Sequence, residues 1–118
     1  MKKQISGWGR NIFVDTNIFF PKNLGQLKKD IKKNCIARGF GRSYGDSSIN
    51  SKNTVITTQL KKIINFDKKK GTLEAESGVS IEQILELIVK EGWFLPVTPG
   101  SKKITLGGMI ASDVHGKN

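Results

Sequence analysis

The residues best suited to chemistry form a glycine-rich segment from Arg38 to Ser48, with the sequence RGFGRSYGDSS. Its three glycines permit positive φ angles and carry no Cβ, so successive backbone N–H groups can converge into a concave nest for an anion. Arg42 adds a fixed positive charge, and Ser43 and Tyr44 add hydroxyl groups. These features suit a phosphate or diphosphate. The alternative is an ordinary loop that needs glycine for its turns, and the spacing alone does not decide between the two.

The spacing of these glycines differs from both common nucleotide-binding motifs. It is G-x-G-x-x-x-G, whereas the Rossmann fingerprint is G-x-G-x-x-G at the start of a helix. Polar residues and then a strand-like run follow the segment, and no Gly-Lys-Ser/Thr sequence of a P-loop occurs. The segment therefore belongs to neither class.

A second glycine-rich stretch lies at residues 96–118. Pro99-Gly100 is a turn signal. Gly107-Gly108 predicts a backbone that approaches another group closely and then begins a short helix, whose N-terminus would favour an anion. His115 is the only histidine of the chain. A lone histidine is more often structural than catalytic, so its residue type alone does not select it as a catalyst.

The overall composition gives weaker information about function. The chain has 118 residues, a formal net charge of +10 and 20 basic residues, of which 17 are lysines, most of them in scattered pairs and one triplet. A basic module that binds nucleic acid or phosphate without catalysis is therefore an alternative, although readers of bases and phosphates favour arginine over lysine. Exposure to solvent explains most of the lysines.

The chain has a single cysteine, Cys35, which excludes a disulfide scaffold. We expect the Cys35 side chain to be buried, and we expect the protein to lie in a reducing compartment, the cytoplasm. No secretory signal and no apolar run near the length of a membrane span occurs.

The hydrophobic pattern predicts an α+β chain with a small sheet flanked by helices. Residues 1–20 lack a clear period and are expected to be irregular. The other expected elements are a short amphipathic helix at about 24–33, a short buried strand at 35–37, and strands at 54–57, 63–66, 72–75 and 94–95.

The best-defined expected element is a helix that begins after Ser80. Ser80 and Gln83 have the spacing of a capping box, in which each side chain satisfies a free N–H group of the other residue. Val79 and Ile84 are placed to form the hydrophobic staple, and a stripe of apolar residues extends to Ile88. Gly92 is expected to end the helix.

Taken together, the two glycine-rich segments resemble the FAD-binding domain of the vanillyl-alcohol-oxidase/PCMH superfamily. The first resembles that domain's diphosphate loop, and residues 96–118 are similar to its second flavin-contacting stretch. The resemblance runs from about Gly7 to Asn118 and is strongest to members that oxidise a polyprenylphosphoryl ribose. It implies that residues 1–118 are the N-terminal portion of a PCMH-type FAD-binding domain, incomplete at its C-terminus and without the substrate domain.

The resemblance also implies a set of cofactor-binding residues. The first loop would surround the FAD diphosphate and ribityl chain, and the second stretch would line the flavin. Covalent members have a flavin-linked histidine where this chain has Arg42, so the resemblance implies non-covalent FAD. The implied residues are Ala37, Arg38, Gly39, Phe40, Gly41, Arg42, Ser43, Tyr44, Gly45, Asp46, Ser47, Gly100, Thr105, Leu106, Gly107, Gly108, Ser112, Asp113, Val114 and His115.

The implied activity is that of an FAD-dependent oxidoreductase acting on CH–OH groups. A sugar or alcohol hydroxyl would be oxidised to a carbonyl by hydride transfer to flavin N5, and the 2′-hydroxyl of a polyprenylphosphoryl ribose is one such group. The implied partners are FAD, a sugar or alcohol substrate that is lipid-linked in the nearest members, and a reductase subunit for the full-length enzyme, with no nucleic acid. The catalytic base is expected beyond residue 118, and no metal is implied.

Overall fold

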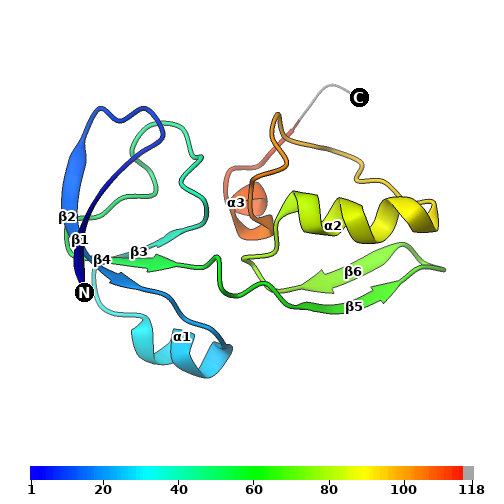
Figure 1. Ribbon diagram of the computed structural model, residues 1–118, viewed down its shortest axis with the longest axis horizontal. Helices are drawn as coiled ribbons and strands as arrows, with labels where there is room; N and C mark the ends of the chain where they lie inside the picture. The colour runs from blue at the N-terminus through cyan, green and yellow to red at the C-terminus, as the bar shows by residue number, and fades with distance from the viewer. Residues whose placement is uncertain (116–118) are drawn as a thin grey trace. The chain divides into compact units, whose positions relative to one another are not determined.

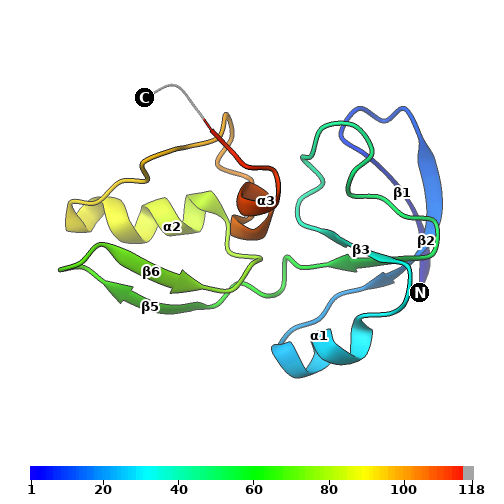
Figure 2. The same cartoon turned by 180° about the vertical axis from the view of Figure 1, so that it is seen from behind.

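The computed structural model describes residues 1–115 and divides the chain into two compact units, Met1–Leu60 and Lys61–Asn118. The last three residues of the second glycine-rich stretch, 116–118, lie outside the described residues. Strands and helices occur in both units, which confirms the predicted α+β class. The strands belong to two separate sheets, one in each unit. Figures 1 and 2 show the two sheets from opposite sides.

The first unit contains a four-stranded sheet. Its strands are β1 (Lys2–Ser6), β2 (Phe13–Phe19), β3 (Cys35–Arg38) and β4 (Asn53–Ile56), in the spatial order β1-β2-β4-β3. β1 and β2 form an antiparallel hairpin, whereas β4 runs parallel to both β2 and β3. The prediction that residues 1–20 are irregular is therefore wrong.

The reason for that error lies in β2. Val14, Thr16 and Ile18 point inward at alternate positions, and the residues between them are exposed. The central inward residue is a threonine, which weakens the apolar period. Thr16 is nevertheless fully buried, because its hydroxyl lies 2.9 Å from the hydroxyl of Thr54 on β4. This pairing joins residues 38 positions apart and leaves no local signal in the sequence.

Helix α1 (Leu24–Asp30) connects β2 to β3. Asn23 caps it by accepting a hydrogen bond from the backbone N–H of Gln26 at 2.8 Å. Ile31, the C-cap, is already extended, so the helix ends earlier than predicted. Leu24 and Ile31 are more than half exposed, so the predicted apolar stripe is present but not buried within the described residues. Cys35 is only half-buried, which corrects the expected buried position.

The second unit is built around helix α2 (Ile81–Ile88), which lies along the hairpin of β5 (Ile63–Asp67) and β6 (Thr72–Ala75) in both views (Figures 1 and 2). The hairpin and its turn lie where the sequence predicts them. The short 3-10 helix η1 (Val89–Glu91) extends α2, and Gly92 ends it in the left-handed region at φ +84°. The buried core consists of Val79, Ile81, Ile84 and Ile88.

Only half of the predicted capping box forms. Ser80 Oγ accepts from the N–H of Gln83 at 3.0 Å, but the Gln83 side chain donates to the carbonyl oxygen of Lys61 instead of returning to Ser80. Two further N–H groups of the first turn, those of Ile81 and Glu82, donate to the carbonyl oxygens of Ile104 and Lys102. A distant segment of the chain thus shares the capping of α2.

The last helix of the described residues is the short α3 (Leu106–Ala111), capped by Thr105. Gly107 and Gly108 lie inside this helix, whereas the prediction places them before it. Residues 94–95 do not form a strand, which corrects another expectation. Of the helices between residues 1 and 115, none has the length and apolar character that crossing a bilayer needs.

Candidate functional site

The first glycine-rich loop begins where β3 ends. Because β3 and β4 are adjacent and parallel, the chain must cross back along the sheet between Arg38 and Asn53. The loop is tied at both of its ends. The carbonyl oxygen of Arg38 accepts from the N–H of Thr57 at 2.9 Å, and Arg38 Nη1 donates to the buried hydroxyl of Ser48 at 3.3 Å. The Arg38 side chain therefore connects the beginning and the end of the loop.

The backbone at residue 41 favours glycine. Its φ is +71°, a conformation that side chains with a Cβ rarely adopt, and the residue is buried. An ideal Cβ built there would lie 2.8 Å from Cζ of Arg38. Gly45 also has a positive φ, +59°, but no atom lies within 4 Å of the position of its missing Cβ. Gly41 thus has both a positive φ and close packing against Arg38, whereas Gly45 has only the positive φ.

The loop keeps its backbone donors available. From Gly39 to Ser48, no backbone N–H group donates a hydrogen bond to an acceptor within residues 1–115. Polar backbone groups are almost always paired with protein, water or ligand. A run of free N–H groups around glycines with positive φ is the arrangement expected of an anion-binding nest.

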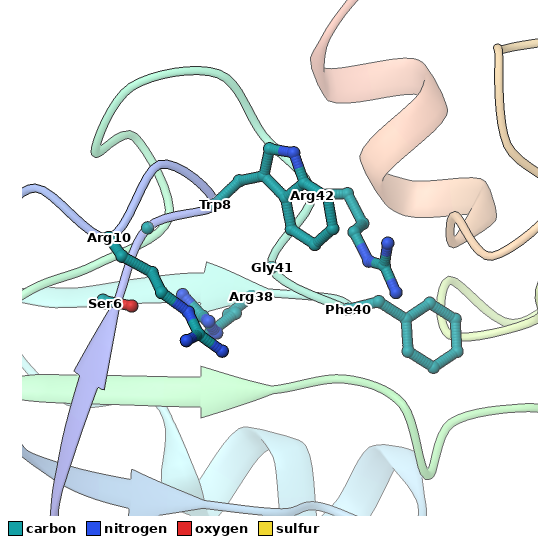
Figure 3. Close-up of a pocket in the computed structure, with 8 residues that line it drawn as sticks. Ser6, Trp8, Arg10, Arg38, Phe40, Gly41 and Arg42 are labelled. Atoms are coloured by element: carbon teal, nitrogen blue, oxygen red, sulfur yellow. The ribbon is translucent and has the colours of Figure 1, made fainter.

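A hollow of about 420 Å³ lies beside this loop (Figure 3). Its walls come from the loop itself and from the turn between β1 and β2. The lining includes three arginines, two aromatic rings and backbone of both segments. The lining residues are Ser6, Gly7, Trp8, Arg10, Arg38, Phe40, Gly41 and Arg42.

The electrostatics of the hollow are dominated by cations. Cζ of Arg42 lies 4.3 Å from the centroid of the Trp8 ring, within the range of a cation–π contact. Burial lowers the pKa of Arg38, although an arginine keeps its charge at any physiological pH. Among residues 1–115 the salt bridges are Lys68–Glu91 and Lys102–Glu82, so none of the three arginines is paired with a carboxylate there. The hollow is suited to an anionic group.

The second predicted segment lies in the other unit and is built differently. The N–H groups of Leu106, Gly107 and Gly108 donate to Val79 O, Ser77 O and Thr105 Oγ1 at 2.8 to 3.0 Å. The start of α3 therefore does not offer these donors to an anion, contrary to the expectation from sequence. An ideal Cβ on Gly107 would lie 3.0 Å from Cβ of Ser77, so the close approach is to the chain itself.

The remaining predicted residues of this segment are mostly exposed. Gly100, Ser112, Asp113 and His115 are exposed and Val114 is half-buried. The Nδ1 atom of His115 lies 3.1 Å from the carbonyl oxygen of Asp113, whose φ is +47°. These groups are accessible to a ligand.

The structure brings the predicted loop residues Ala37–Ser47 together in the first unit, and it places Gly100 and residues 105–115 in the second. Sequence reasoning missed Trp8 and Arg10 as members of the hollow. Their signal was the run Gly7-Trp8-Gly9-Arg10, in which glycines on both sides of an aromatic residue indicate a tight turn that precedes an arginine.

The chain is similar to one known protein family and to several known oxidases. Residues 23–118 match the family described as "FAD binding domain". Decaprenylphosphoryl-beta-D-ribose oxidase of Mycolicibacterium smegmatis is 32% identical over 98% of this chain, and the chain covers 27% of that protein. Two solved structures cover 98% of the chain: a cholesterol oxidase from B. sterolicum, with TM-score 0.76 and 19% identity, and a solvent-stable cholesterol oxidase, with TM-score 0.74 and 23% identity.

The chain spans about a quarter of the length of each of these three proteins. The two cholesterol oxidases share its fold, that of the N-terminal part of a PCMH-type FAD-binding domain. The family match includes both glycine-rich segments and excludes the β1–β2 hairpin, which precedes residue 23. These findings support the flavoprotein interpretation and not that of a basic binding module. The chain belongs to the FAD binding domain family, and FAD is the cofactor of that family.

Proposed function

We propose that the protein is an FAD-dependent oxidoreductase that oxidises a CH–OH group to a carbonyl. The observation that carries the proposal is the run of free backbone N–H groups from Gly39 to Ser48, within the residues that match the FAD binding domain. The similarity to an oxidase over 98% of the chain supports the reaction class.

In this proposal the first loop holds the FAD diphosphate. The loop fits that group because its backbone N–H groups from Gly39 to Ser48 are free, and because arginines beside it offset negative charge. Residues Ala37–Ser47 would surround the diphosphate and ribityl chain. Gly100, the run Thr105–Gly108 and the run Ser112–His115 would line the flavin.

When bound, FAD would supply the redox chemistry by taking up the hydride of the carbinol carbon, and the hydroxyl proton would leave to a base. The residues of this chain bind and orient the cofactor. His115 is exposed and is proposed as a group that contacts the flavin.

We infer that the FAD is held without a covalent bond. Arg42 occupies the position at which the resemblance places the flavin-linked histidine of covalent members, and a guanidinium does not form that link. Arg42 instead contacts the ring of Trp8. Cofactor affinity would then depend on charge, hydrogen bonds and burial.

The substrate class that we propose is a polyprenylphosphoryl ribose, oxidised at its 2′-hydroxyl. The name of the Mycolicibacterium smegmatis relative supports the phosphoryl ribose, and the resemblance of the loops supports the position. A reductase partner subunit and a cytoplasmic location are part of the same proposal.

An anaerobic titration tests the reaction. The protein, expressed from its complete reading frame and loaded with FAD, is mixed with a polyprenylphosphoryl ribose, and the visible absorption of the flavin is followed. Loss of the oxidised-flavin band, with formation of one carbonyl product per flavin, is expected. A 2′-deoxy analogue is the matched control and should leave the band unchanged. A bound flavin that neither this substrate nor other sugar alcohols reduce would contradict the proposed reaction.

A further inference from the structure

We propose that the turn Gly7–Arg10, which joins β1 to β2, completes a binding site for the phosphate or diphosphate group of an organic ligand. In this site Arg10 acts with Arg38 as a binding cation, and Trp8 positions Arg42. The inference rests on the proposed function only in that FAD is one of two sources of such a group. The turn lies outside the family match, which begins at residue 23.

The turn is packed directly against the glycine-rich loop. Gly7 is buried, and an ideal Cβ on it would lie 2.5 Å from the carbonyl oxygen of Gly45 and 2.9 Å from Oδ1 of Asp46. Because Gly7 has no side chain, its backbone packs against the loop at Gly45 and Asp46, and this packing fixes the position of the turn relative to the loop. The two segments therefore form the walls of one hollow, as Figure 3 shows.

Arg10 is held in an unusual backbone conformation. Its φ is +54°, and its N–H closes the turn by donating to the carbonyl oxygen of Gly7 at 3.1 Å. A positive φ is unfavourable for a residue with a long side chain, and such strain is found preferentially at binding sites. Glycine or asparagine would suit this backbone better. The presence of arginine at this position, with its side chain lining the hollow, points to a use for its charge.

Trp8 gives Arg42 a defined place. More than half of the Trp8 surface is exposed, so burial of the ring does not explain its position. The ring instead supports the Arg42 guanidinium at 4.3 Å. A side chain that is positioned before binding loses less conformational freedom when a ligand arrives.

The charge balance of the hollow favours a strongly anionic ligand. Three guanidinium groups line it, and no described carboxylate forms an ion pair with any of them. Asp46 is the acidic residue whose carboxylate lies against the turn, at Gly7. Guanidinium groups match phosphate oxygens in pairs, which a lysine ammonium does not.

Two ligands could supply the phospho group: the diphosphate of FAD or the phosphate of a phosphorylated substrate. Arg10→Asn removes the charge while asparagine tolerates the positive φ, so the variant is expected to fold. Trp8→Leu removes the support of Arg42. Lys3→Gln, at an exposed residue of β1 that does not line the hollow, removes one positive charge elsewhere and is the matched control.

Each variant is titrated with inorganic pyrophosphate, with FAD and with riboflavin, which has no phosphate. Thermal denaturation reports pyrophosphate binding, and flavin fluorescence reports FAD and riboflavin. Arg10→Asn should weaken pyrophosphate binding by about 10- to 100-fold, the loss expected for one charge-assisted contact, and Trp8→Leu by less. Lys3→Gln should change it by less than about twofold.

The affinities for FAD and riboflavin identify which ligand supplies the phospho group. A weaker FAD affinity with unchanged riboflavin affinity for Arg10→Asn assigns the site to the cofactor. An unchanged FAD affinity, with ribose 5-phosphate binding to the FAD-loaded protein that Arg10→Asn weakens, assigns it to the substrate. If Arg10→Asn binds every phospho ligand like the wild type, or if Lys3→Gln loses as much affinity, the inference is wrong. If neither the wild type nor any variant binds FAD, the proposed function is wrong. The pyrophosphate titration would still show whether the turn Gly7–Arg10 contributes to a phosphate site.

Discussion

The guanidinium group of Arg38 fills the space that a side chain at Gly41 would need, since a Cβ there would lie 2.8 Å from Arg38 Cζ. The same guanidinium donates to the hydroxyl of Ser48 at 3.3 Å. One side chain therefore packs against the middle of the glycine-rich loop and ties its end. The shape of the proposed diphosphate site depends on this arrangement.

Alanine substitutions at Gly41 and Gly45 distinguish the effect of packing against Arg38 from the effect of the positive φ. Gly41→Ala and Gly45→Ala both place a Cβ at a positive φ, which costs about 1 to 2 kcal/mol. Gly41→Ala also displaces the Arg38 guanidinium from its hydrogen bond to Ser48, so it should lower the free energy of unfolding by about 0.5 to 1.5 kcal/mol more than Gly45→Ala. Urea denaturation measures both. Equal losses would show that Arg38 does not pack against residue 41 as described.

The buried hydroxyl pair between Thr16 and Thr54 allows a double-mutant cycle. Thr16→Val or Thr54→Val alone leaves one buried hydroxyl without its partner and should lower the free energy of unfolding by about 1 to 3 kcal/mol. The double variant should be closer to the wild type than the sum of the single losses, because no unpaired hydroxyl remains. Additive losses, measured by urea denaturation, would contradict the hydrogen bond.

The capping of α2 gives a third prediction. Ser80→Ala removes the acceptor for the N–H of Gln83 and should lower the free energy of unfolding by about 1 kcal/mol. Gln83→Ala removes only an exposed hydrogen bond to Lys61 and should cost less than about 0.5 kcal/mol. Thermal denaturation of the two variants provides the comparison. A cost for Gln83→Ala equal to that for Ser80→Ala would indicate a reciprocal capping box.

These contacts show where local sequence is sufficient. The helix at 81–88 could be predicted because its cap, its apolar stripe and its final glycine lie within a dozen residues of one another. The β5–β6 hairpin is also local, with a polar turn between two apolar runs. In contrast, β2 depends on Thr54, a partner far along the chain, and its own apolar pattern is interrupted by Thr16.

The candidate site shows the same division. The loop from Arg38 to Ser48 could be identified from its glycines, two of which have positive φ. Arg10 and Trp8 were not identified, because their contribution depends on the packing of Gly7 against Gly45. The pair Gly107-Gly108 suggested space for a ligand, but Gly107 approaches Ser77 and both N–H groups have acceptors within the unit. A glycine pair in the sequence indicates that the backbone approaches another group closely, but it does not indicate whether that group is a ligand or another part of the chain.

We propose that the chain holds FAD reversibly, with the loop around Gly41 against the diphosphate. The most direct measurement is the visible spectrum of the protein expressed from its complete reading frame, before and after acid precipitation. We predict flavin absorption that passes entirely into the supernatant, and FAD affinity that falls at least tenfold in Gly41→Val. A folded, colourless protein that does not bind added FAD, or flavin that stays with the precipitate, would contradict reversible FAD binding at this loop.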